Sequence, residues 1–298
     1  MSGTTTADVR LELAKEEAAE AGRGIIRSHE TSPSTFLVVG LELEEQQYAL
    51  LYYLCVSTDI SRYRRDLANE YKKKKTTTLQ AAELLEKRNL LRRRIETWRA
   101  VQLHYMPGIA QARASLTPTT SEQPKTTELC LPSRMPSSLW ATGCLPGVVE
   151  KEKRLRLAQA DDALAELRRQ LCIAATICDY KKSIGSSQKL GLKTRTLLNR
   201  FHDKTLRCAR RYTAAFTALT ALDPNGDWTA HLRHLDHAKD IRGPHREEED
   251  ESEGKREMSW IWLAGRTGGW PSSDMVTADE ISTSEYIPQV SVSIILLT

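Results

Sequence analysis

Three regularly spaced histidines are the first candidates for chemistry in this sequence. His231, His234 and His237 form an H-x2-H-x2-H series, and zinc commonly takes histidines that lie one turn apart on a helix. Residues at steps of three rotate by about 60° per step around a helix, however, so the three rings fan apart. No cysteine nearby in the sequence offers a fourth ligand. We interpret the three as surface or partly packed histidines and expect no metal site.

Acidic residues form two further patterns. Residues 223–227 (Asp-Pro-Asn-Gly-Asp) resemble a calcium loop, but their glycine is fourth and the twelfth position is His234, whereas an EF-hand needs glycine sixth and glutamate twelfth. This stretch is typical of a turn followed by a helix cap. Asp161, Asp162 and Glu166 cluster beside two arginines. That arrangement favours ion pairs on a solvated helix face over the converging carboxylates of a two-metal nuclease.

Motifs for nucleotide binding and nucleophilic catalysis are missing from the sequence. It contains no GxGxxG, GxxxxGK[ST] or GxSxG, and its six cysteines show no CxxC spacing. Cys172 and Cys178 fall on an apolar helix pattern, where nothing basic is arranged to lower a thiol pKa. We therefore predict a protein that is not an enzyme and that uses no cofactor, metal or small-molecule substrate.

Basic residues gather in three stretches. Residues 62–75 carry seven bases and two acids, residues 87–99 six and one, and residues 193–211 seven and one. Bases on one helix face can neutralise phosphates, although they also commonly solubilise the outer face of a long helix. Both interpretations stay open. The candidate nucleic-acid contacts are Arg62, Arg64, Arg65, Lys72, Lys73, Lys74, Lys75, Arg92, Arg93 and Arg94.

Composition excludes several classes of protein. The net charge is only +4, 40% of the residues are hydrophobic and cysteines number six among 298 residues, which excludes a collagen-like repeat, a disulfide miniprotein and a multi-span membrane protein. The first ten residues are polar, and no window reaches the ~18 apolar residues of a membrane span. We expect an intracellular protein, in the nucleus or the cytoplasm, that does not contact membranes.

Helix-forming stretches alternate with turn residues along most of the chain. We predict helices over 5–21, 41–75, 78–105, 147–183, 190–222 and 228–240. Residues 30–40 are expected to be a loop and then briefly extended. Five of the eleven prolines lie between 115 and 147, which predicts a long linker or an irregular connection there, with a short helix at 137–142.

The apolar stripes of 147–183 and 190–222 are the clearest structural signal. The short connection between these helices predicts an antiparallel hairpin. Its expected packing seam consists of Leu157, Leu164, Leu167, Leu171, Leu197, Phe201, Tyr212 and Leu219.

The predicted fold is all-α, with long amphipathic helices, an antiparallel and coiled-coil-like helical hairpin, and a disordered linker and tail. The expected domains are an N-terminal helical segment (1–108), a Pro/Ser/Thr-rich linker (109–146), the hairpin with a short helix (147–242), and an acidic tail (243–298) that is mostly disordered apart from 258–263.

An ordered series of short motifs adds a resemblance to a known family. The chain resembles the C-terminal helical part of fungal transposases of the Kyakuja-Dileera-Zisupton group, over about residues 7–263. The matching stretches are Gly40–Gln47, Leu90–Ile95 with Trp98, Tyr105–Gly108, Lys151–Leu171, Asp179–Lys182, Gln188–Leu190, Thr194–Arg200, Ala209–Tyr212, Asp240–Gly243, Glu253-Gly254 and Ser259–Trp262.

The resemblance implies an origin and carries no catalytic residue. Such transposases combine a CxC-type cysteine cluster, a metal-dependent catalytic core with acidic residues, and a helical tail. This chain looks like the tail alone, because neither the cysteine cluster nor the acidic motifs have counterparts in it. After Leu263 it departs from the helical continuation that the family leads us to expect.

Together these observations favour a non-catalytic, transposase-derived helical module. We expect it to associate with itself or with another transposase-derived protein, because long helices with few aromatics bury little apolar surface unless they pair. The alternative is an accessory nucleic-acid binder that uses the basic stretches. A gene fragment without activity is the remaining alternative.

Overall fold

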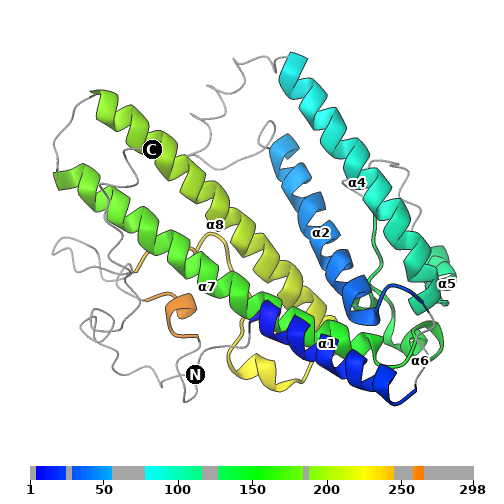
Figure 1. Ribbon diagram of the computed structural model, residues 1–298. Helices are drawn as coiled ribbons and strands as arrows, with labels where there is room; N and C mark the ends of the chain where they lie inside the picture. Colours follow the sequence, from blue (N-terminus) through cyan, green and yellow to red (C-terminus); the bar gives the residue numbers. More distant parts are fainter. Residues whose placement is uncertain are drawn as a thin grey trace. The chain divides into compact units, whose positions relative to one another are not determined.

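The described part of the chain has an all-α fold, as the sequence predicts (Figure 1). A computed structural model describes residues 5–24, 29–55, 78–115, 127–183, 188–244 and 258–264. These ranges hold seven α helices and no strand. The helices are α1 (Thr6–Gly22), α2 (Pro33–Cys55), α4 (Thr78–Tyr105), α5 (Ile109–Ser115), α6 (Trp140–Gly143), α7 (Val148–Ser183) and α8 (Gln188–Leu222), with 3-10 helices η1 (Pro132–Arg134), η2 (Ser137–Leu139), η3 (Asp227–Ala230) and η5 (Trp260–Trp262).

The structure divides into two compact units. The N-terminal unit consists of Thr6–Arg156 together with Thr217–Pro224, and the C-terminal unit is built mainly from Leu157–Phe216 and the residues from Asn225 onward. The long helices α7 and α8 therefore contribute to both. The N-terminal unit thus contains residues from both sides of the domain boundaries predicted at 108 and 146.

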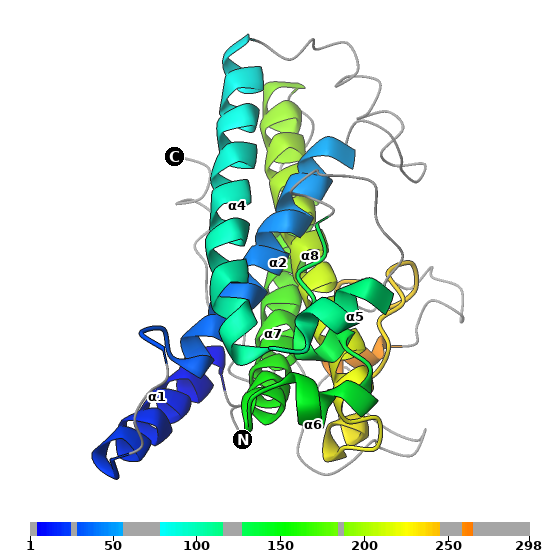
Figure 2. The ribbon, with the colours of Figure 1, turned by 90° about the vertical axis from the view of Figure 1, so that its right-hand side faces the viewer.

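Helices α2 and α4 pack together in the N-terminal unit (Figure 2). Phe36 stacks on Trp98 with ring centroids 5.1 Å apart, and Trp98 Nε1 donates a hydrogen bond of 2.9 Å to the carbonyl oxygen of Phe36. A Cβ at Gly40 would lie 2.9 Å from Leu131 Cδ2 and 3.0 Å from the Trp98 ring. The close approach of α2 to these two side chains therefore requires glycine at this position.

Helix α2 begins earlier than the sequence prediction allowed. Residues 30–40 were expected to be a loop and an extended stretch, which is wrong, because the helix starts at Pro33. Ser32 precedes it, and the backbone N–H of Thr35 donates to Ser32 Oγ over 3.2 Å, as at a helix N-cap. Pro33 occupies the first helical position, where its missing N–H costs nothing. Of the predicted helix 41–75, residues 56–75 lie outside the described part of the chain.

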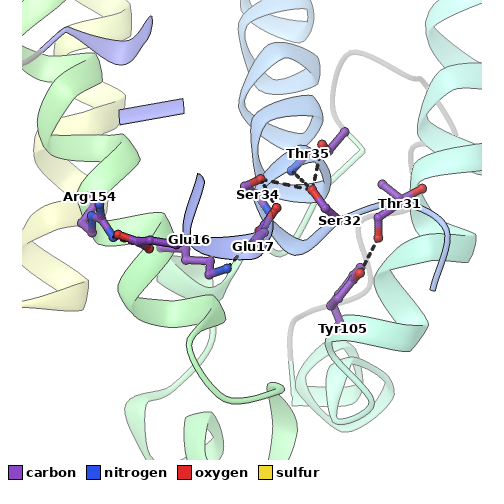
Figure 3. Close-up of polar contacts among 9 residues, drawn as sticks. Glu16, Glu17, Thr31, Ser32, Ser34, Thr35, Tyr105 and Arg154 are labelled. Carbon is purple, nitrogen blue, oxygen red and sulfur yellow. Dashed lines mark hydrogen bonds and ion pairs between the residues drawn. The ribbon is translucent and has the colours of Figure 1, made fainter. Parts of the chain in front are cut away.

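Ion pairs attach α1 to its neighbours in the N-terminal unit (Figure 3). The buried carboxylate of Glu17 accepts hydrogen bonds from the Ser34 N–H at 2.9 Å, from the Ser34 hydroxyl at 2.8 Å and from Lys151 Nζ at 2.9 Å. Arg154 on α7 donates to Glu16 at 2.9 Å. Together with the fully buried Leu13, these contacts hold α1 against α2 and the start of α7.

Two parts of the expected linker over 109–146 lie in the described residues, and the short helix expected at 137–142 corresponds to η2 and α6. Residues 109–115 form α5, and residues 127–146 pass through η1, η2 and α6. This second segment buries Leu129, Cys130, Leu131, Met135 and Cys144. It is therefore part of the core of the N-terminal unit, while residues 116–126 lie outside the described ranges.

In the C-terminal unit, α7 and α8 lie side by side and antiparallel (Figure 1), which agrees with the predicted hairpin. The segment after α8 differs from its prediction, because residues 228–240 do not form an α helix. Only Asp227–Ala230 is helical, as the 3-10 helix η3, and the chain then turns so that Leu232 and Leu235 are buried. The hydroxyl of Tyr212 donates to the carbonyl oxygen of Arg233 over 2.7 Å, which fixes this path.

A short segment near the C-terminus also packs in this unit. Ile261 is fully buried, and the Arg168 guanidinium on α7 donates to the carbonyl oxygens of Ile261 and Ala264. Trp262 Nε1 donates to the carbonyl oxygen of Arg242 over 3.2 Å. The structure thus bears out an ordered segment over 258–263, and the rest of the predicted tail, 245–257 and 265–298, lies outside the described residues.

Candidate interaction surfaces

The predicted nucleic-acid contacts fall in different environments. Arg62, Arg64, Arg65, Lys72, Lys73, Lys74 and Lys75 lie outside the described residues. On α4, Arg92 and Arg93 are exposed, whereas Arg94 is partly buried and pairs with Glu42 of α2 at 3.5 Å. At least one base of the α4 cluster is therefore engaged within the molecule.

A basic stripe on α8 lies within the third basic stretch. Arg200, Lys204 and Arg207 are exposed, and their spacing of four and three residues places them on one helix face. The Lys204 ammonium lies 5.2 Å from the centroid of the Phe201 ring, within the range of a cation–π contact. We call these three residues the α8 basic stripe.

The predicted packing seam is largely inside the molecule. Six of its residues are buried, namely Leu164, Leu167, Leu171, Phe201, Tyr212 and Leu219. Leu157 and Leu197 are partly exposed. These side chains stabilise the fold, so they are not available to a partner.

Most of the exposed large apolar side chains among the described residues lie on α4, where the sequence did not lead us to expect them. Leu79 is 69% exposed, Leu85 57%, Leu90 60% and Leu103 57%. They lie out of phase with the seam of α4, whose members Leu91, Ile95, Trp98 and Tyr105 are buried. This difference in phase could have predicted their exposure from the sequence, because leucines outside the apolar seam of an amphipathic helix face solvent unless another chain covers them.

The three candidate histidines diverge toward different partners. His231 Nε2 lies 3.9 Å from an Asp161 oxygen, the His234 ring packs edge-on against Phe216, and His237 Nε2 lies 3.3 Å from the Thr213 hydroxyl. Burial and the charge of Arg210 lower the pKa of His237. Among the described residues, no three His, Cys, Asp or Glu side chains gather as a metal site would require.

The candidate carboxylates have structural partners, and the cysteines differ in burial. Burial opposes ionisation of Glu166, yet hydrogen bonds from Arg169 and Gln170 lower the pKa of its carboxyl group below the usual value. Asp161 faces His231 instead, so these acids do not converge. Burial raises the pKa of the Cys144 thiol to about 11, which keeps it protonated and a poor nucleophile at neutral pH. Cys178, expected in the core, is exposed.

A buried ion network was not foreseen from the sequence. Arg156 on α7 is 1% exposed, and its guanidinium donates to Glu44 of α2 at 2.6 Å and to Glu152 at 3.2 Å. The Glu152 carboxylate also accepts the N–H and the hydroxyl of Ser133, both at 2.8 Å. Burial raises the pKa of Glu152, although the charge of Arg156 acts in the opposite direction. The network therefore fixes η1 to α2 and α7.

Side-chain donors also line up along residues 127–130. Gln47 of α2 donates to the carbonyl oxygen of Thr127 at 2.6 Å, and Arg99 of α4 to that of Glu128 at 3.1 Å. Gln102 Nε2 donates to the next two carbonyl oxygens, at 2.8 and 2.9 Å. The side chains of α2 and α4 thereby satisfy carbonyl oxygens of a segment that no strand pairs with in the described part of the chain.

Comparisons with known proteins add no relative to these observations. No protein-family model, curated protein or solved structure matches the chain. None of the helices in the described ranges combines the length and the apolar character of a membrane span.

Proposed function

We propose that this chain is a non-catalytic helical module, derived from a transposase, that associates with a second copy of itself. The observation that carries the proposal is the set of leucines on the solvent side of α4, each 57–69% exposed. Fully burying a leucine stabilises by about 1.5–3 kcal/mol, so each of these side chains still offers about 1–2 kcal/mol to a partner.

The resemblance to transposase tails supports the origin, and the side-chain chemistry supports the absence of catalysis. Glu166 pairs with Arg169, Asp161 lies next to His231, His234 packs against Phe216 and His237 lies next to Thr213. A reaction site needs groups that converge on a substrate atom, and these groups diverge.

Sedimentation of the full chain over a wide range of concentration tests the proposal. The wild-type chain should associate as concentration rises, and the variant Leu79→Ser/Leu90→Ser should associate much less while keeping its helical circular dichroism. Leu11→Ser is the matched control, because Leu11 is 56% exposed but lies on α1. A wild-type chain that stays monomeric at every concentration would overturn the proposal.

A second candidate function, contact with nucleic acid, is favoured by the α8 basic stripe. Three exposed cations on one helix face can track a phosphate backbone. Binding to duplex DNA should fall steeply with salt, and replacing all three residues by alanine should reduce the slope of log affinity against log salt by about 1 per residue. Arg169→Ala is the control, because Arg169 is exposed but pairs with Glu166. Absence of DNA binding at low salt ends this candidate.

A further inference from the structure

One face of α4 carries a regular exposed stripe in which the sign of the charge changes along the helix. The residues of this outer stripe follow one another at steps of four and three, which keeps them on one face, and all six are exposed. They are Leu79, Glu83, Glu86, Leu90, Arg93 and Thr97. The acids precede Leu90 and the base follows it.

The two charges next to Leu90 have no partner in the described part of the molecule. Neither Glu86 nor Arg93 lies in an ion pair there, whereas the neighbouring Arg94 is engaged by Glu42. On α4 itself, no base lies three or four positions from Glu86, and the nearest charge on its face is Glu83. Glu83 and Glu86 repel each other at this spacing, so a positive charge placed next to them would stabilise the outer stripe.

We propose that the outer stripe pairs with the same stripe of a second copy in antiparallel orientation. This step rests on the self-association proposed above and adds its geometry. With the twofold axis next to Leu90, Glu86 faces the partner's Arg93 and Arg93 faces the partner's Glu86. The two Leu90 side chains meet between these reciprocal ion pairs.

The order of charges along the outer stripe complements the same stripe in the opposite direction, so a second copy of the chain is the expected partner. An isologous contact repeats each interaction twice, so a surface must complement itself when turned around. A parallel pairing would instead place Glu86 opposite the partner's Glu86 and Arg93 opposite the partner's Arg93. Since α4 has 28 residues and is about 42 Å long, the contact can extend over several turns on each side of Leu90.

Charge reversal of the full chain tests the pairing. In Glu86→Arg, both reciprocal contacts become base against base, and in Arg93→Glu both become acid against acid. Each variant alone should dimerise about tenfold or more weakly than the wild type, since two contacts change from attraction to repulsion. An equimolar mixture of the two variants should form heterodimers, because acid then meets base at both contacts, and the double variant Glu86→Arg/Arg93→Glu should recover self-association.

Controls separate this geometry from self-association in general. Lys15→Glu and Glu30→Arg reverse exposed charges outside α4 and should change neither dimerisation nor its behaviour on mixing. If Leu79→Ser/Leu90→Ser abolishes association but the mixed charge variants associate no better than each alone, the antiparallel pairing is wrong while self-association stands. If the wild type does not associate, both proposals fail. Circular dichroism of each variant verifies that α4 remains folded.

Discussion

Removing Arg156 should destabilise the N-terminal unit far more than removing its neighbour Arg154. Both arginines lie on α7 and each contacts two carboxylates, but Arg156 is 1% exposed and Arg154 30%. Arg156→Met leaves Glu152, which is fully buried, as an unpaired charge, and breaking a buried pair in this way costs about 3–5 kcal/mol. Arg154→Met breaks pairs that solvent screens, which should cost about 1 kcal/mol or less.

Urea unfolding followed by circular dichroism and tryptophan fluorescence measures the two costs. The penalty of Arg156→Met should shrink on acidification, because protonating Glu152 removes the unpaired charge. Adding Glu152→Gln to Arg156→Met should also recover part of the loss. Equal costs for the two arginine variants would refute the reasoning that burial, and not the number of carboxylate partners, decides the contribution of these ion pairs.

Three further predictions concern single positions. Burial raises the pKa of the Glu17 carboxyl group, but hydrogen bonds from Lys151, Ser32 and Ser34 outweigh burial and lower this pKa below 4.5. The stability that Glu17 contributes should therefore be present above pH ~4.5 and be lost as pH falls through the lowered pKa. Glu17→Gln should flatten this part of the curve of stability against pH. Gly40→Ala places a Cβ 2.9 Å from Leu131 and should cost about 1–3 kcal/mol in urea unfolding, whereas Gly22→Ala, with nothing within 4 Å, should not cost stability. Leu164→Asp, at a buried position, should lower the thermal unfolding temperature of the hairpin without selectively abolishing self-association; a fully folded monomer would contradict this.

Helices with a continuous apolar stripe could be predicted from the sequence, because burial of one face follows directly from residue spacing. The ranges 147–183 and 190–222 correspond closely to α7 and α8. Turn and helix-capping residues predicted the local structure less well. Pro33 and its neighbouring serines were interpreted as a loop, although Ser32 followed by proline is also the start of a helix. After Asp227, a cap and apolar residues predicted a helix, but burial of Leu232 and Leu235 and the Tyr212 hydrogen bond favour another path.

The polar core could not be predicted, because its members are far apart along the chain. Glu44 and Arg156 are separated by 112 positions, and each lies in a charged stretch that is typical of a solvated face. The same holds for Gln47, Arg99 and Gln102, whose role is to satisfy the carbonyl oxygens of 127–130. A segment rich in proline, serine and threonine thus enters the core because side chains from two helices replace the backbone partners that it lacks.

The two proposed activities depend on different surfaces, and salt distinguishes them. Phosphate contacts by the α8 basic stripe would release counterions, so affinity for DNA should fall as a power of salt concentration. Pairing of the outer stripe of α4 combines leucine burial, which salt does not weaken, with exposed ion pairs that salt only screens. Self-association that persists at a salt concentration where DNA is fully released would therefore separate the two activities. If Glu86→Arg and Arg93→Glu lose their preference for each other at that salt concentration while wild-type association remains, the ion pairs select the orientation and the leucines supply the affinity.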